Sequence, residues 1–111
     1  MPAEFIEVSS VDDLNTLFDQ SATATVILYN HDPYCPISAR AIREMQKVND
    51  TVALIDVSRG QQLSSAIAER TGIRHESPQV IVLKGGHPTW NASHFAITAG
   101  AVEQATSDSE G

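Results

Sequence analysis

The chain has 111 residues, 41% of them hydrophobic, a size that predicts one domain, residues 1–111, with a single compact core. Fourteen acidic residues against seven basic ones give a formal net charge of −7, which disfavours nucleic acid and anionic membranes as partners because both would be repelled. No apolar run approaches the roughly 20 residues that cross a bilayer, and residues 1–4 lack the features of a signal peptide, so we expect a cytoplasmic protein.

Short apolar segments alternate with helical patterns through the first seventy residues. Two of these segments are continuous and partly β-branched, which is typical of strands covered on both faces. Helices are expected between and after the strands, because apolar residues there recur three and four positions apart. In chain order the predictions are a strand at 5–8, a helix from residue 11, a strand at 24–29, a helix over 36–49, a strand at 52–57 and a helix over 60–71.

The last third of the chain predicts a β-hairpin and a short helix. Strands are expected at 80–83 and 88–91 around a glycine turn, followed by a weak helix over 98–106. Residues 107–111 are small, polar and acidic, so we expect a disordered tail. The order βαβαββα predicts an α/β protein of thioredoxin-like fold, with a central mixed sheet flanked by helices. A flavodoxin-like sheet is the alternative, but it would continue with another βα unit rather than a hairpin.

The single cysteine, Cys35, lies after a predicted buried strand and at the start of a predicted helix. Unpaired N–H groups and the helix dipole at such a position stabilise a thiolate, and His31 would add positive charge if protonated. The alternative is a buried, inert cysteine. One thiol cannot form an internal disulfide and fits a reducing compartment. Cys35 is therefore predicted to be a catalytic nucleophile that reacts with thiols of other molecules.

Four further residues are predicted to line the substrate site. Pro36 suits the first turn of a helix, and Ser38 stands where a dithiol enzyme has its second cysteine, so a one-cysteine mechanism is expected. The Ser38 hydroxyl would either hydrogen-bond the Cys35 thiolate or cap the helix. Pro78 enters a strand without an N–H, and we predict a cis Ser77–Pro78 bond in a loop facing Cys35. There the Ser77 backbone would pair with the substrate.

Other residue types that carry chemistry give weaker signals. His75, His87 and His94 lack the spacing of a zinc site, so no bound metal is expected. Trp90 would either pack on the sheet or wall the thiol-binding groove. Arg40, on the helix after Cys35, is expected on a solvated face.

Three segments together resemble the monothiol bacilliredoxin family: residues 34–39 (YCPISA), 72–79 (GIRHESPQ) and 90–98 (WNASHFAIT). The resemblance extends over roughly residues 4–106. It implies a thioredoxin-like fold and removal of bacillithiol from S-bacillithiolated proteins, with Cys35 as the nucleophile and Ser77–Pro78 as the substrate-facing loop.

Partners and alternatives follow from this resemblance. It implies no bound cofactor, bacillithiol as co-substrate, and S-bacillithiolated client proteins and a low-molecular-weight thiol as partners. One alternative is a glutaredoxin-like protein that serves another small thiol or carries an iron–sulfur cluster. Another is a non-catalytic binding module on a thioredoxin scaffold, because fold does not determine function.

Overall fold

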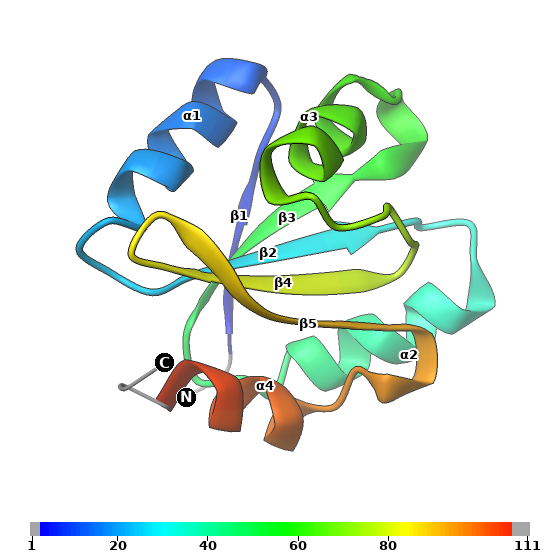
Figure 1. Ribbon diagram of the computed structural model, residues 1–111. Helices are drawn as coiled ribbons and strands as arrows, with labels where there is room; N and C mark the ends of the chain where they lie inside the picture. Colours follow the sequence, from blue (N-terminus) through cyan, green and yellow to red (C-terminus); the bar gives the residue numbers. More distant parts are fainter. Residues whose placement is uncertain (1–2, 108–111) are drawn as a thin grey trace.

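The computed structural model describes residues 3–107, which form one mixed β-sheet with helices on both faces (Figure 1). The order of the main elements confirms the predicted βαβαββα. Apart from Ser107 at the end of the last helix, the predicted tail lies outside the described residues. The elements are β1 (Glu4–Glu7), α1 (Val11–Gln20), β2 (Val26–His31), α2 (Pro36–Met45), β3 (Thr51–Asp56), η1 (Val57–Arg59), α3 (Gln62–Thr71), β4 (Gln79–Lys84), β5 (His87–Ser93), η2 (His94–Ala96) and α4 (Ala99–Ser107).

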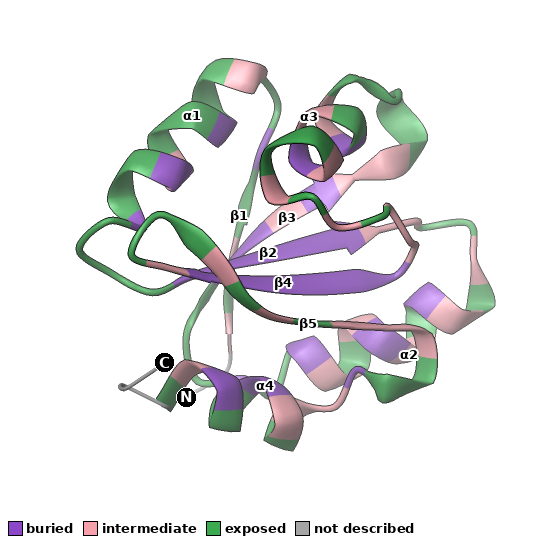
Figure 2. Ribbon diagram, viewed as in Figure 1, coloured by how far each residue is buried: buried purple, intermediate pink, exposed green. Residues whose placement is uncertain are grey.

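The sheet has the strand order β1-β3-β2-β4-β5. β1, β3 and β2 run parallel, whereas β4 runs antiparallel to β2, and β5 antiparallel to β4. Both β2 and β4 are buried along nearly their whole length, as Figure 2 shows, while β5 at the edge contains only exposed and partly buried residues. The antiparallel β4 and its hairpin to β5 exclude the flavodoxin-like alternative, which requires further parallel βα units.

Side chains on the two faces of the sheet form two apolar clusters. Alternation along β2 sends Val26 and Leu28 toward α1 and α3, and Ile27 and Tyr29 toward α2 and α4. Figure 1 shows these two helix pairs on opposite sides of the strands. The helices contribute Leu14, Phe18 and Ile67 to the first cluster, and Ala41, Met45 and Val102 to the second.

Most predicted boundaries differ from the structure by a residue or two, but the helix expected over 36–49 ends already at Met45. Beyond it the chain tightens into a turn, in which Lys47 N–H donates to Glu44 O and Val48 N–H to Met45 O, both at 3.1 Å. This turn directs Val48 into the core, where 1% of it is exposed. The apolar spacing therefore predicted the burial of Val48 correctly but not its backbone conformation.

Three connections meet at one edge of the sheet. Asn30, near the end of β2, lies opposite Gln79, the first residue of β4. Gln79 in turn lies opposite Ser93, the last residue of β5. The segment from β2 to α2, the segment leading into β4, and η2 after β5 therefore all leave the sheet at the same edge (Figure 1). Residues far apart in the sequence, on these three segments, are thereby brought to one edge of the sheet.

Candidate functional site

Cys35 is the N-cap residue of α2, at the end of the tight loop that follows β2. Its N–H donates to Asp32 O at 3.1 Å, and its carbonyl accepts a bond from Ala39 N–H at 3.1 Å. Pro36 occupies the first turn, where its missing N–H leaves no bond unmade. The Cys35 thiol is free and partly exposed, so it is open to a reaction partner rather than buried as an inert core residue.

Ser38 holds the loop before Cys35 against α2. It is fully buried, and its hydroxyl oxygen accepts a hydrogen bond from Asp32 N–H at 3.3 Å. Because Cys35 is the N-cap, the second of the two alternatives for the Ser38 hydroxyl, that it caps the helix, is wrong. Its placement in the substrate site stays a prediction, and any influence on substrate would act through the loop. Tyr34 at the loop's tip is 84% exposed, and its N–H donates to Asp32 Oδ1 at 3.0 Å.

A buried tyrosine lies beneath this loop. Tyr29 is completely buried; its hydroxyl oxygen is 2.9 Å from His31 Nδ1, and it donates to Ser38 O at 3.4 Å. Burial raises the pKa of Tyr29, and the nearby charge of Cys35 raises it further. From the sequence alone, this residue is predicted only as part of a buried strand. The signal that could have shown more is its i, i+2 spacing from His31, which puts both side chains on one face of β2.

His31 does not provide the positive charge considered from the sequence. Burial lowers its pKa, and this effect outweighs the opposing effects of Asp56 and then Asp32. The imidazole is therefore neutral near pH 7. Stabilisation of a Cys35 thiolate by an adjacent imidazolium finds no support in this arrangement.

The Ser77–Pro78 bond is cis, as predicted. Pro78 is buried at the entrance to β4, and its carbonyl accepts a bond from His94 N–H at 3.0 Å. The Ser77 hydroxyl lies 3.3 Å from His75 Nε2. The loop leaves the sheet at the edge where β2 ends, which places it on the same side of the molecule as Cys35. A contact of Ser77 and Pro78 with substrate stays a prediction.

Two buried amides fasten this loop to the sheet. Gln79, 2% exposed, receives a hydrogen bond from Asn30 Nδ2 at 3.0 Å and donates from its own Nε2 to Arg74 O at 2.9 Å. Glu76 N–H also donates to Gln79 Oε1, at 3.4 Å. The position of the segment before Pro78 therefore depends on side-chain bonds to the central strands.

Residues of β5 and η2 complete this edge of the sheet. Trp90 is half-buried and packs on the α2 and α4 side of the sheet, the first of its two predicted places.

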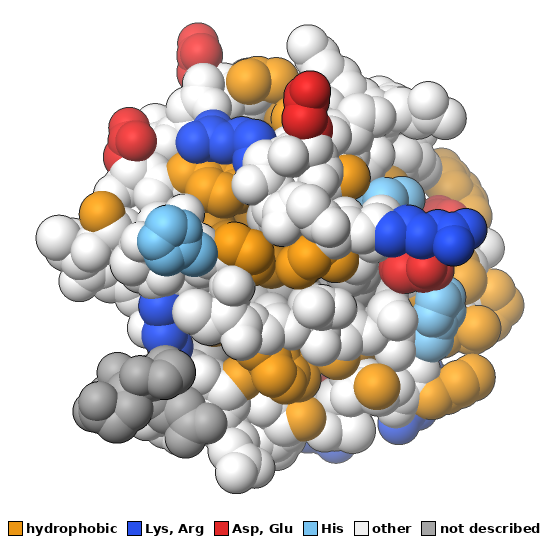
Figure 3. Space-filling model, viewed as in Figure 1, with side chains coloured by type: hydrophobic (Ala, Val, Ile, Leu, Met, Phe, Trp, Pro, Cys, Tyr) orange, Lys and Arg blue, Asp and Glu red, His pale blue; other side chains and the backbone are white. Residues whose placement is uncertain are grey.

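The Arg40 guanidinium lies over the Phe95 ring, 5.5 Å from the ring centre, although Phe95 is 64% exposed. Arg40 also donates a hydrogen bond to Ile97 O at 3.5 Å. Arg40, expected on a solvated face, is partly exposed and partly covered by the Phe95 ring of η2. His94 Nε2 lies 3.8 Å from a carboxylate oxygen of Glu76. Around this edge Figure 3 shows basic, acidic, histidine and hydrophobic side chains next to one another.

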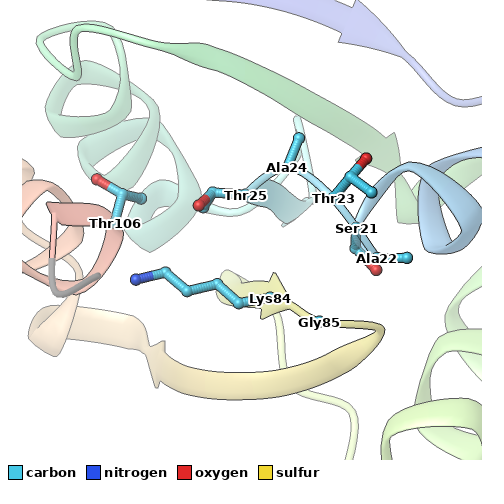
Figure 4. Close-up of a pocket in the computed structure, with 8 residues that line it drawn as sticks. All are labelled: Ser21, Ala22, Thr23, Ala24, Thr25, Lys84, Gly85 and Thr106. Carbon is cyan, nitrogen blue, oxygen red and sulfur yellow. The ribbon is translucent and has the colours of Figure 1, made fainter. Parts of the chain in front are cut away.

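A hollow of about 310 Å³ lies at the opposite end of β2 (Figure 4). It opens between the α1–β2 connection, the β4–β5 turn and α4, and the Lys84 side chain extends along it toward Thr106. Because Cys35 follows the other end of β2, this hollow does not belong to the thiol site. Its lining residues are Ser21, Ala22, Thr23, Ala24, Thr25, Lys84, Gly85 and Thr106.

Within residues 3–107, no three His, Cys, Asp or Glu side chains gather closely enough to hold a metal ion. No helix in the same range is long and apolar enough to span a membrane.

Comparison with known protein families shows to which family the chain belongs. The family model described as monothiol bacilliredoxin BrxC matches residues 6–102, nearly the whole length. The chain belongs to the monothiol bacilliredoxin family. The resemblance of the three sequence segments to this family is thereby confirmed, and the chain shares the thiol redox function that defines such proteins in general terms.

Solved structures similar to this bacilliredoxin-family chain confirm the fold. A thioredoxin-fold protein provisionally assigned as an oxidoreductase is 30% identical, over 91% of this chain and 92% of that chain, with a TM-score of 0.83. Chloroplastic thioredoxin z is 16% identical over 96% and 95% of the two chains, with a TM-score of 0.73. Thioredoxin from Trypanosoma brucei brucei is 17% identical over 96% and 91%, with a TM-score of 0.74. At these identities the two thioredoxins show similarity of fold alone.

Proposed function

We propose that this bacilliredoxin-family protein removes bacillithiol from S-bacillithiolated proteins by thiol–disulfide exchange at Cys35. The observation that carries the proposal is the position of Cys35, the one cysteine of the sequence, as a partly exposed N-cap of α2. Family membership supports bacillithiol as the small thiol. The buried Ser38 supports a one-cysteine mechanism, because no second thiol stands one helical turn away.

The proposed reaction is a pair of sulfur displacements. The Cys35 thiolate attacks the bacillithiol sulfur, the disulfide between bacillithiol and the client protein breaks, and the client sulfur leaves as a thiolate that takes up a proton. Cys35 is left in a mixed disulfide with bacillithiol. A second thiol, either free bacillithiol or that of a partner reductase, then attacks this disulfide and releases Cys35. Each step breaks one disulfide and forms another, so no further oxidant or reductant is required.

The residues around Cys35 would align the substrate. A mixed disulfide presents a strand-like segment of the client next to its modified cysteine, and the Ser77 backbone is proposed to pair with that segment. The bonds from Gln79 to Asn30 and Arg74 support this role, because they hold the loop before Pro78 in place without substrate.

Mass spectrometry tests the proposal. A bacillithiolated client protein is incubated with the wild-type protein and with Cys35→Ser, whose fold is verified by circular dichroism. The wild type is expected to gain one bacillithiol on Cys35 as the client thiol is freed, and the variant to do neither. Exchange by Cys35→Ser, or no exchange by the wild type, would overturn the proposal.

A parallel incubation tests the choice of small thiol. The same client is modified with glutathione instead of bacillithiol, and the two rates of release are compared. Faster release of bacillithiol is expected. Faster release of glutathione, or a brown iron–sulfur chromophore after anaerobic purification, would instead support the glutaredoxin-like alternative.

A further inference from the structure

The hydroxyl of Tyr29 makes two contacts but carries only one hydrogen. It donates to Ser38 O at 3.4 Å and lies 2.9 Å from His31 Nδ1. If the hydroxyl hydrogen pointed at His31 Nδ1, the contact with Ser38 O would pair two acceptors and no bond would form there. If His31 Nδ1 carries a hydrogen and donates it to the phenol oxygen, both contacts are hydrogen bonds. Because Tyr29 is completely buried, bulk water would not replace a lost bond, and the second arrangement is favoured.

This arrangement determines the state of the other ring nitrogen. A neutral imidazole carries one hydrogen, so a hydrogen on Nδ1 leaves Nε2 of His31 with a free lone pair. The lowered pKa of His31, caused mainly by burial, keeps the ring neutral near pH 7. A neutral histidine whose orientation is held by a buried partner has the form required of a general base.

The ring lies among the elements that carry Cys35. His31 ends β2, four residues before Cys35, and the turn between them is closed by the bond from Cys35 N–H to Asp32 O. Tyr29, to which His31 is bonded, is close enough to Cys35 to be influenced by its charge, and it bonds to Ser38 of the first turn of α2. The charged groups that act on His31 are Asp56 at the end of β3 and Asp32 in the loop.

The geometry points to His31 Nε2 as the base that manages protons at Cys35, with Tyr29 as the positioning residue that holds His31 in the required tautomer. This inference rests on the proposed exchange reaction. As Cys35 attacks, its thiol proton passes to Nε2, and the imidazolium then gives that proton to the client thiolate that leaves. In the second half-reaction Nε2 takes the proton of the incoming small thiol and returns it to Cys35. His31 ends each half-reaction neutral, and no electrons are gained or lost by it.

A measurement of the tautomer tests the first step without reference to activity. Long-range proton–nitrogen NMR correlations distinguish an imidazole protonated on Nδ1 from one protonated on Nε2, and the His31 signals are identified by their absence in His31→Asn. The wild type is expected to carry its proton on Nδ1, and Tyr29→Phe to shift toward the Nε2-protonated form. An Nε2-protonated His31 in the wild type would refute the inference even if exchange occurs.

The pH dependence of exchange tests the second step. General acid–base catalysis contributes about 10²–10⁴-fold in rate, and because thiols ionise readily we expect the lower end, about a hundred-fold loss in His31→Asn. Asparagine retains a donor near the Nδ1 position but has no base at Nε2. The wild-type rate should fall as pH drops below the ordinary histidine value of 6.5 and His31 becomes protonated, and the variant should lack this inflection.

Matched variants separate the chemical role from a structural one. Tyr29→Phe should lower the rate by about ten-fold and weaken the same inflection, since its histidine is no longer held. Tyr34→Phe removes the same hydroxyl group from an exposed ring and should retain the wild-type pH profile. Wild-type pH profiles in both Tyr29→Phe and His31→Asn would overturn the inference while leaving the exchange function intact. If Tyr29→Phe does not fold, His31→Asn and the wild-type tautomer decide the question. No exchange by the wild type would instead refute the proposed function itself.

Discussion

Substitution of Gln79 by methionine provides the most direct test of how the loop before Pro78 is held. Methionine has nearly the shape of glutamine but no hydrogen-bonding groups, so the change removes bonds without opening a large cavity. Two are lost at normal length, from Asn30 Nδ2 at 3.0 Å and to Arg74 O at 2.9 Å. Asn30 is only 1% exposed, and its Oδ1 already has no partner, so its whole amide would become unpaired.

The expected loss of stability follows from these contacts. An unpaired buried amide costs about 1–3 kcal/mol, and the bond to Arg74 contributes about 0.5–1.5 kcal/mol. Burial of a thioether in place of an amide increases the free energy of unfolding by about 1 kcal/mol, which offsets part of this loss. Gln79→Met is therefore expected to lower the free energy of unfolding by about 2 kcal/mol. Asn30→Leu should cost less, because it also removes the unpartnered Oδ1.

Urea denaturation followed by circular dichroism measures these differences, with free energies obtained by linear extrapolation. The double variant Asn30→Leu with Gln79→Met removes both partners and should be more stable than Gln79→Met alone. A coupling energy of about 1–2 kcal/mol is expected between the two sites. Additive effects, or a loss below about 0.5 kcal/mol in Gln79→Met, would show that the amide pair does not hold the loop.

Three further predictions concern Ser38, His31 and the glycine that ends α3. Ser38→Cys places a second thiol one helical turn from Cys35 and should release bacillithiol from the Cys35 adduct by forming an internal disulfide, which mass spectrometry detects as loss of the adduct. Because the folded-state pKa of His31 is depressed, the unfolded chain binds more protons below pH 6.5, so the free energy of unfolding should fall as pH drops below that value. This fall should be smaller in His31→Asn, as urea titrations at pH 7 and 5.5 would show. Gly72→Ala should destabilise the protein by about 1 kcal/mol, measured by thermal unfolding, because Gly72 ends α3 at a φ of +71°.

Much of the fold could be predicted from local sequence patterns. The continuous apolar runs of β2 and β3 predicted buried strands, and the late hairpin distinguished the mixed sheet from a doubly wound one. The length of β5 was underestimated. It is an edge strand whose alternate residues face water, so it lacks an apolar run. The end of α2 was missed because Val48 is buried equally well from a turn as from a helix.

The sequence by itself determined where the single thiol lies and what its local setting is. A lone Cys35 between a buried strand and a proline that starts a helix needs no distant residue to be recognised, since strand, turn and helix signals lie within a dozen positions. Only the tertiary structure decided which side chains near Cys35 form hydrogen bonds with one another. Asn30 and Gln79 bond across 49 residues, and the contacts of Tyr29 with His31 and Ser38 exist because the loop folds back over β2. Directional bonds of this kind depend on how elements pack in space, which periodicity along the chain does not encode.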